Sequence, residues 1–431
     1  MILFLGMFFL GISYVFKKQN KSWLNPGSLF AILWGTVFCL YSFKLFEINS
    51  VSDKTIVIFS AGVISFCIGY YPIKFTLGQK RLYKSYGLTY CGFKVPYRFR
   101  FLLLILSFIT IAILAIRVVN TLPYWAGGVS FVKQANAEGY ITYSSWVSIL
   151  YTFLARPFET VAVFVAAMDF FFSRDSLARI QTFVTIIMII LGYLCSGSKF
   201  SLFVPVFSFI LVYCVYKSKK KTDGERVRGI PWWKKGLIVS VGLITIIFII
   251  YMLNSKYDGN WLKSLYFYLV GCLPCGDNAI LDMQKSNISY YGMVSLNGFA
   301  RVVAHAFSFI GVQVPYSSYM NEAYNSILSY EHAIYIAPDV PYNAFISLFA
   351  YFYKDGGLFA VILFSFIFGK LVSRMYERMM IEESAYSLLL YLYSCYLILY
   401  SIVRSQMYLV TSVMTLIYII LFFSRRKWVK R

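Results

Sequence analysis

The chain has 431 residues, of which 59% are hydrophobic and only 13% are charged. Soluble domains carry about a quarter charged residues, so this composition excludes a soluble enzyme or a soluble binding module. The formal net charge of +22 does not indicate a nucleic-acid partner, because the Lys and Arg residues lie in short clusters between apolar runs. The anionic headgroups of a lipid bilayer are the partner that this pattern explains.

The apolar runs predict eleven membrane-spanning helices, since each crossing needs about 20 apolar residues. In chain order the runs lie near 1–16, 28–43, 55–73, 101–116, 149–172, 180–196, 201–216, 237–253, 356–373, 386–402 and 407–423. We therefore predict an all-α fold, a polytopic membrane bundle of about 11 (10–12) transmembrane helices. We interpret residues 1–431 as a single transmembrane domain.

The distribution of basic residues predicts the orientation. Most of the 40 Lys and Arg residues fall in the loops that begin at 17, 74, 173, 217 and 374 and in the tail from 424. The positive-inside rule places these segments in the cytoplasm, so the N-terminus is expected outside and the C-terminus inside. We interpret Met1–Phe16 as the first crossing and not as a signal peptide, because its basic residues follow the apolar run.

Two segments on the expected outer side are long. They run from about 117 to 148 and from about 254 to 355, and the second is rich in Tyr, Phe and Trp. Within it, Val294–Val314 is apolar but carries Arg301 and His305, which is typical of an amphipathic helix lying in the membrane interface. Asn343–Phe352 is expected to dip into the membrane. Any chemistry of the chain is therefore expected on the outer face.

One pair of the eight cysteines has a spacing of interest, Cys272 and Cys275. The strand–helix context of a thioredoxin motif is missing around it. The sequence is compatible both with a local disulfide between these two cysteines and with two free thiols. Four ligands do not gather around it, so we expect no metal, and the chain shows no nucleotide-binding or other cofactor motif.

Two cations interrupt or join predicted crossings. Arg156 lies inside the fifth crossing, where a charge usually faces a cavity or a partner. It either forms a structural pair with Glu159, three residues further along the helix, or contributes to a substrate cavity, and the two roles are compatible. Lys199, in the turn Ser196-Gly197-Ser198-Lys199, presents a cation at the outer interface, although lysines commonly do so at helix ends.

Arg117, Arg301 and Arg404 also fall on the expected outer side. Taken singly, each of these arginines is explained by a contact with a lipid headgroup. Several arginines on the face that the positive-inside rule disfavours are harder to explain in this way. Since Arg is well shaped for bidentate contact with phosphate, we expect Arg117, Arg156, Lys199, Arg301 and Arg404 to include the cations of a phosphate site.

The chain has two histidines, His305 and His332, both in the second long outer segment. Either is a candidate general base, and the alternative for each is an ordinary surface histidine. Asp355 precedes a predicted crossing in the turn Lys354-Asp355-Gly356-Gly357. We expect it to cap that helix, a structural role, in preference to a catalytic one.

Two motifs resemble those of the Wzy-type polymerases, which join the oligosaccharide repeat units of bacterial O-antigens. The stretch Tyr342–Phe359, with Asn343 early and Asp355-Gly356-Gly357 late, precedes an apolar run that ends in Gly369. The turn Gly197-Ser198-Lys199 resembles the family's Gly-Ser-Arg turn. The layout of about eleven crossings with a large outer loop in the second half is also similar.

The chain departs from the family pattern at two positions. Lys199 stands where the family has Arg, which keeps the charge but loses the planar guanidinium. Gly356 stands where an aromatic residue follows the Asp. A third pattern of some members, an Arg and a Gly with ten residues between them, fits Arg117 and Gly128, but it recurs by chance and adds little.

The resemblance implies a glycosyltransferase on the outer face of the bacterial cytoplasmic (inner) membrane. It would move a growing glycan from undecaprenyl diphosphate onto a new lipid-linked repeat unit, in the biosynthesis of O-antigen lipopolysaccharide or capsular polysaccharide. The implied partners are these lipid-linked oligosaccharides, with a chain-length regulator protein and a flippase. Two alternatives stay open: an O-antigen ligase, and a flippase or other transporter of lipid-linked oligosaccharides.

Overall fold

A computed structural model describes most of the chain. The residues outside the description are 21, 72–92, 94, 96, 138, 174, 198–199, 223–235, 237–259, 287, 313–316, 331–333, 343–344 and 425–431. The chain forms two compact units, each assembled from separate stretches of sequence. Unit 1 comprises Met1–Leu82, Leu243–Arg378 and Ser394–Val410, and unit 2 comprises Tyr83–Gly242, Met379–Tyr393 and Thr411–Arg431.

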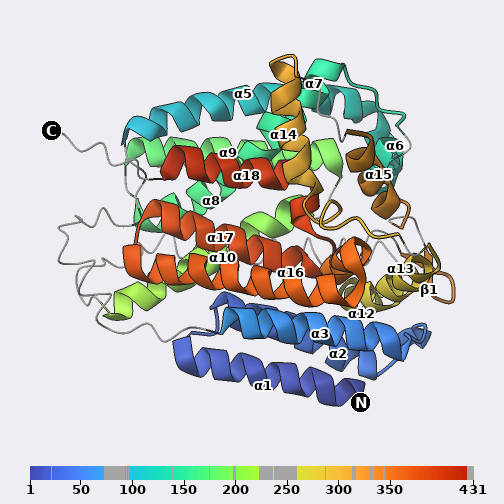
Figure 1. Cartoon of the computed structure of the whole chain (residues 1–431). Coiled ribbons are helices and arrows are strands. Elements are labelled where there is room, and N and C mark those ends of the chain that lie inside the picture. The colour runs from blue at the N-terminus through green and yellow to red at the C-terminus, as the bar shows by residue number, and fades with distance from the viewer. Residues whose placement is uncertain are drawn as a thin grey trace. The chain divides into compact units, whose positions relative to one another are not determined.

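The helices of unit 1 come from both halves of the chain (Figure 1). They are α1 (Ile2–Asn20), α2 (Pro26–Ser42), η1 (Leu45–Glu47), α3 (Asp53–Tyr70), α12 (Trp261–Val270), α13 (Cys272–Ser286), α14 (Asn297–Phe309), α15 (Ser317–Leu328), most of α16 (Ser347–Glu382), η6 (Tyr400–Ile402) and η7 (Gln406–Tyr408). A short antiparallel hairpin, β1 (Ile334–Ala337) and β2 (Val340–Tyr342), pairs Ile334 with Tyr342.

An aromatic core joins α2, α3 and α16 in unit 1. The ring of Phe30 stacks on that of Phe66 at 3.7 Å, and Trp34 lies 4.7 Å from Phe349. Two glycines let α3 and α16 approach closely, because a Cβ at Gly69 or Gly369 would overlap the backbone of the facing helix. Small residues at such contacts are typical of helices packed within a membrane.

Unit 2 is built around a second set of long helices. They are α5 (Tyr97–Thr121), η2 (Leu122–Gly127), α6 (Gly128–Ala137), α7 (Ser145–Leu150), the π-helical segment η3 (Tyr151–Ala155), α8 (Arg156–Phe172), α9 (Ser176–Ser196), α10 (Phe200–Thr222) and most of α18 (Val410–Phe423). Helix α17 (Ala385–Leu399) is divided between the units at Tyr393. Helices α5, α8, α9 and α10 pack against one another.

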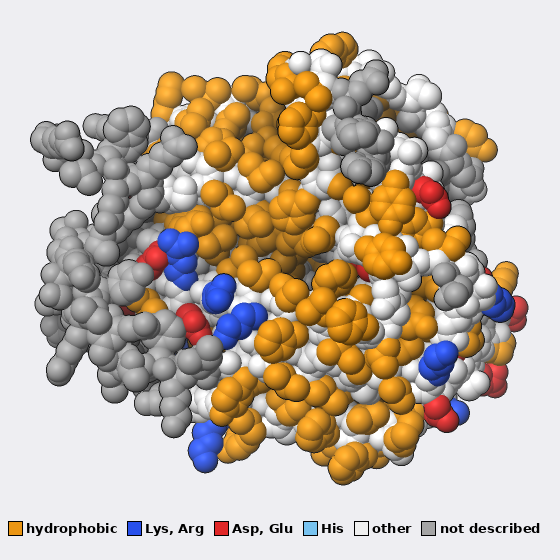
Figure 2. All heavy atoms as spheres, in the orientation of Figure 1, with side chains coloured by type: hydrophobic (Ala, Val, Ile, Leu, Met, Phe, Trp, Pro, Cys, Tyr) orange, Lys and Arg blue, Asp and Glu red, His pale blue; other side chains and the backbone are white. Residues whose placement is uncertain are grey.

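The described helices confirm the predicted all-α membrane bundle. Eight of them are long and apolar enough to cross a membrane, and the shorter apolar helices α2 and α18 add two more. Together they correspond to ten of the eleven predicted crossings, and the remaining one, 237–253, lies outside the described residues. Hydrophobic side chains cover much of the visible surface of α16 (Figure 2), where Phe359 is 73% exposed. Such a surface suits contact with lipid.

One predicted boundary differs from the structure. The sequence places a turn at Lys354–Gly357 and a crossing from 356, but α16 begins at Ser347 and continues through a kink at Gly356 and Gly357. The preceding segment is helical because it belongs to the core, where Phe349, Ala350 and Tyr351 are fully buried. Gly357 has a φ of +63°, which a glycine tolerates and which bends the helix.

Candidate functional site

The predicted site residues fall into two groups. Arg117 and Arg156 lie in unit 2, and Arg301, His305, Asp355 and Arg404 lie in unit 1. Lys199 and His332 lie outside the described residues. Two of the five predicted cations therefore lie in unit 2 and two in unit 1. Each group is described by itself.

Arg156 follows a π-helical segment of unit 2. The five residues Tyr151–Ala155 form wider i→i+5 turns, which often occur at functional sites. The Arg156 guanidinium then donates to two partners, Glu159 Oε2 at 2.7 Å and Ser201 Oγ at 3.0 Å. The pair that the sequence spacing predicts is thus present. The Arg156 side chain is 26% exposed, so it is paired but not fully buried.

The Glu159 carboxylate is buried against α9. Its side chain is 4% exposed, and burial of a charge is costly unless it is paired. Gly192 on α9 makes the space, because a Cβ at this position would overlap the carboxylate. This role of Gly192 could not be predicted from the sequence, since it depends on a contact between helices. Glu159 is therefore fixed on α9, and it fixes Arg156 in turn.

Arg117, near the end of α5, is held between two aromatic rings. Its guanidinium carbon lies 3.6 Å from the centroid of Tyr143 and 3.9 Å from that of Tyr151. Among the described residues Arg117 has no ion pair with a carboxylate, and its Nε atom is buried without a hydrogen bond. Cation–π contacts of this kind contribute about 0.5–2 kcal/mol each. The charge of Arg117 is thus held in place by two tyrosine rings.

Tyr151 connects the two arginines. Its ring contacts Arg117, and its hydroxyl lies within the electrostatic reach of Arg156, Glu159 and Arg117. Burial raises the pKa of Tyr143, and the nearby Arg117 opposes this only in part, so the Tyr143 hydroxyl stays protonated near neutral pH. We call Arg117, Arg156, Glu159, Tyr143 and Tyr151 the arginine site. It carries two cations and one carboxylate, a net positive charge suited to an anionic ligand.

The Gly-Ser-Lys turn begins beside this site. Gly197 ends α9 with a φ of +59°, a left-handed conformation that glycine favours at helix ends. Ser196 Oγ lies 3.3 Å from the Oγ of Ser201, the residue that accepts from Arg156. Ser198 and Lys199 are outside the described residues.

In unit 1, Arg301 on α14 also stacks on a tyrosine. Its guanidinium carbon lies 3.8 Å from the centroid of Tyr324, and Nη2 donates to Asn321 Oδ1 at 3.0 Å. Tyr324 in turn stacks on Tyr408, with centroids 4.8 Å apart. Gly298 packs closely against the backbone of residues 407 and 409, and this contact holds α14 against the turn that contains η7.

His305 lies on α14 with Arg301, and Arg404 lies just before η7, the segment against which α14 packs. The half-buried Arg404 precedes the turn on which α14 packs, and its backbone N–H donates to Tyr400. His305 is exposed and follows Arg301 by four residues, so it shares one face of α14 with Arg301. Arg301, His305 and Arg404 thus lie on segments of unit 1 that pack near one another.

The carboxylate of Asp355 binds a different segment from the predicted one. Its carboxylate is buried and accepts the backbone N–H groups of Val294 at 2.8 Å and Ser295 at 2.9 Å. Its own carbonyl accepts from Tyr291 at 2.8 Å. Asp355 thus fixes the turn that leads into α14, and does so with both carboxylate oxygens. The Asp355 carboxylate therefore binds this turn, whereas the sequence predicted that it caps a helix beginning after it.

Cys272 and Cys275 are free, buried thiols on α13. Burial raises the pKa of both, that of Cys275 to about 12. Among the described residues no three His, Cys, Asp or Glu side chains are grouped as metal ligands would be.

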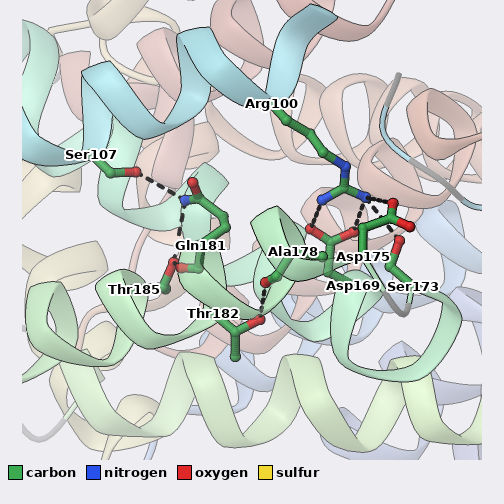
Figure 3. A network of polar contacts seen from close by, with 9 residues as sticks. All are labelled: Arg100, Ser107, Asp169, Ser173, Asp175, Ala178, Gln181, Thr182 and Thr185. Atoms are coloured by element: carbon green, nitrogen blue, oxygen red, sulfur yellow. Dashed lines mark hydrogen bonds and ion pairs between the residues drawn. The ribbon is translucent and has the colours of Figure 1, made fainter. Parts of the chain in front are cut away.

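A buried ion pair in unit 2 was missed by the sequence analysis (Figure 3). Arg100 on α5 is 3% exposed and donates to both carboxylate oxygens of Asp169 on α8, at 2.8 and 2.9 Å. It also donates to Ser173 Oγ at 2.8 Å. In the sequence Arg100 falls at the end of the basic loop that begins at 74, whereas in the structure it forms a buried ion pair between two helices. The available signal was Asp169, an acidic residue inside a predicted apolar crossing.

The fold and the arginine site define a class: a polytopic helical membrane protein with a positively charged, aromatic-lined cluster at one end of its unit 2 helices. No family model, curated protein or solved structure matches the chain.

Proposed function

We propose that the protein is a membrane glycosyltransferase that polymerises oligosaccharide repeat units linked to undecaprenyl diphosphate. The observation that carries this proposal is the arginine site. Arg117 lies between two tyrosine rings without a carboxylate partner among the described residues, and the nearby Arg156 has a side chain that is 26% exposed. Such an arrangement is suited to a diphosphate, which offers several acceptor oxygens to planar guanidinium groups.

The position of the arginine site along its helices supports a lipid-borne ligand. Arg100 and Arg117 lie on the same helix, α5, seventeen residues apart, which corresponds to about 25 Å of helix. The hydrocarbon core of a bilayer is about 30 Å thick. If the buried Arg100–Asp169 pair lies near one boundary, the arginine site lies near the other. The diphosphate of a lipid carrier is found at that depth.

The proposed reaction requires the site to stabilise a leaving group. The bond between the anomeric carbon of the growing glycan and the diphosphate oxygen breaks, and a bond to a hydroxyl of the acceptor sugar forms. Negative charge develops on the diphosphate, where the fixed guanidinium groups of Arg117 and Arg156 stabilise it. The hydroxyl proton passes to a general base. Both Asp355 oxygens already accept backbone N–H groups.

The proposal is tested by chain growth in a defined system. Purified protein in lipid nanodiscs is incubated with lipid-linked repeat units and no other acceptor, and the products are resolved by length. Polymer is expected from the wild type, and Arg117→Ala is expected to lose about a hundred-fold in rate, since the loss of one buried charged partner costs a few kcal/mol. Lys285→Ala, at a side chain that is 79% exposed, is the matched control.

Other outcomes would overturn the proposal. Chain transfer only when a lipid core is added would identify a ligase. Movement of labelled lipid-linked sugar across empty liposomes, without chain growth, would identify a transporter. Normal polymer from both Arg117→Ala and Arg156→Ala would remove the arginine site from the mechanism.

A further inference from the structure

A buried lysine of unit 1 has no charged partner among the residues that the structure describes. Lys354 on α16 is 4% exposed, and among the described residues its ammonium donates to Ser286 Oγ at 3.3 Å. Its other neighbours are the rings of Tyr290 and Tyr330, with Nζ 5.5 and 5.9 Å from their centroids. The ammonium forms no ion pair with a described carboxylate. A lysine has three N–H donors, so this group has donors to spare.

The nearest acidic residue in sequence does not compensate this charge. Asp355 directs its carboxylate to the backbone of Val294 and Ser295. Burying a cation without a carboxylate costs several kcal/mol unless another group accepts its hydrogen bonds. Tyrosine rings recover only part of that cost. Stability alone therefore gives no reason to keep a lysine here.

The groups around Lys354 form an aromatic and hydroxylated cluster. Tyr290 packs against Tyr319, with centroids 5.6 Å apart, and its hydroxyl donates to Glu322 Oε1 at 3.1 Å. Ser286 is exposed, and Tyr319 and Tyr330 are half-buried. We call Ser286, Tyr290, Tyr319, Glu322, Tyr330 and Lys354 the lysine cluster. Its lysine is buried, and two of its tyrosines, Tyr319 and Tyr330, are partly exposed.

The tyrosines of the lysine cluster are neutral hydrogen-bonding groups. Burial raises the pKa of Tyr290, Tyr319 and Tyr330 above the ordinary value near 10. Their hydroxyls therefore stay protonated at physiological pH. Each ring also offers an apolar face beside this polar tip. Flat apolar faces, hydroxyl donors, a carboxylate acceptor and a buried ammonium donor together complement a sugar ring, which has apolar C–H faces and a rim of hydroxyl and ether oxygens.

We propose that the lysine cluster is a saccharide-binding subsite, in which the half-buried tyrosines pack on a pyranose ring and Lys354 donates to one of its oxygens. The inference that this saccharide belongs to a lipid-linked repeat unit rests on the proposed function. The subsite is distinct from the arginine site, because it recognises the glycan and not the diphosphate. It lies in unit 1, on α13, α15, α16 and their adjoining turns.

The experiment measures binding of the glycan without its lipid. The probe is the water-soluble repeat-unit glycan, released from its carrier by mild acid, and its Kd for the full-length protein in nanodiscs is measured by ligand-observed NMR. Lys354→Met is expected to weaken binding at least ten-fold, and Tyr330→Leu about five-fold, since each removes one contact of the ring. Lys354→Arg is expected to restore part of the affinity.

Matched variants serve as controls. Lys285→Met alters a lysine whose side chain is 79% exposed, and Tyr335→Leu alters a tyrosine that is 69% exposed. Both are expected to bind the glycan within two-fold of wild type. Arg117→Ala is also expected to bind the free glycan normally, because the probe has no diphosphate. If Lys354→Met does not fold, Tyr330→Leu decides the question.

Failure of this inference is distinguishable from failure of the proposed function. A protein that elongates polymer but whose Lys354→Met and Tyr330→Leu variants keep wild-type Kd and KM would overturn the lysine cluster alone. A protein that binds the glycan through Lys354 and never elongates it would overturn the polymerase alone. A wild type that binds no glycan at millimolar concentration would overturn the subsite.

Discussion

At the scale of single residues, the shape of the Arg117 side chain is as important as its charge. Lysine in its place would keep the cation but could not stack its ammonium on two rings at 3.6 and 3.9 Å. We predict that Arg117→Lys retains about a tenth of wild-type kcat/KM and Arg117→Ala about a hundredth. Tyr143→Phe keeps the ring and should stay near wild type. Equal rates for the Lys variant and wild type would show that the stacking is irrelevant.

Asp355 gives a prediction that separates stability from activity. In Asp355→Asn one of the two backbone N–H groups, of Val294 or Ser295, would face an amide NH₂ in place of an oxygen. Leaving a buried donor unsatisfied costs about 1–3 kcal/mol. We predict a lower Tm in detergent and a residual rate in the protein that remains folded. A variant with wild-type Tm and no activity would instead require the carboxylate in the reaction.

The two cysteines of α13 give a prediction about pH. A pKa of about 12 for Cys275 leaves about one thiolate in ten thousand molecules at pH 8. Because burial raises the pKa of the thiol, it lowers the reactive thiolate fraction at any given pH. Maleimide labelling of Cys272 and Cys275 should be slow in the native protein, rise with pH, and become complete in SDS without a reductant. Labelling in SDS that needs a reductant would reveal a disulfide.

At the scale of elements, close contacts between helices depend on particular glycines. A methyl group at Gly192 would overlap the Glu159 carboxylate and displace the residue that holds Arg156. We predict that Gly192→Ala lowers both Tm and polymerisation rate, with overpacking costs of about 1–3 kcal/mol. Gly11→Ala, on α1, is the matched control because a Cβ there meets no atom within 4 Å. A harmless Gly192→Ala would mean that α8 and α9 adjust to the extra methyl group.

The elements also show how far the sequence predicted the fold. Apolar runs located the crossings because the thickness of the hydrocarbon core sets the length of a spanning helix. The core also contains no water to satisfy the backbone of an irregular segment, so a helix is favoured there. The same signal misplaced the start of α16, since residues 347–355 are buried by protein and the Gly356–Gly357 kink looks like a turn in sequence. The π-helical turn before Arg156 leaves no sequence pattern that we could read. One of the two partners of Arg156 was predicted, since helical spacing indicated Glu159. Ser201 could not be predicted in this way, because it lies on another helix.

At the scale of the whole molecule, the orientation in the membrane is still a prediction, and unit 2 supplies the positions to test it. The two ends of α5 carry different groups, Arg100 with its buried partner and Arg117 with its tyrosines. The positive-inside rule puts the Arg100 end in the cytoplasm, because the loop that begins at 173 is expected there. The arginine site then faces the side on which lipid-linked glycans would be joined.

Two exposed positions distinguish the faces. Asn120 lies near the Arg117 end of α5, and Ser176 opens α9 near the Arg100 pair. Single cysteines at these positions, in a variant whose native cysteines are replaced, are labelled in intact cells with a charged maleimide that does not cross the membrane. Asn120→Cys should react from outside and Ser176→Cys only after permeabilisation. The reverse result would place the arginine site in the cytoplasm, where no lipid-linked repeat unit is joined to its polymer. The polymerase proposal would then fail even if every contact of Arg117 and Arg156 proved correct.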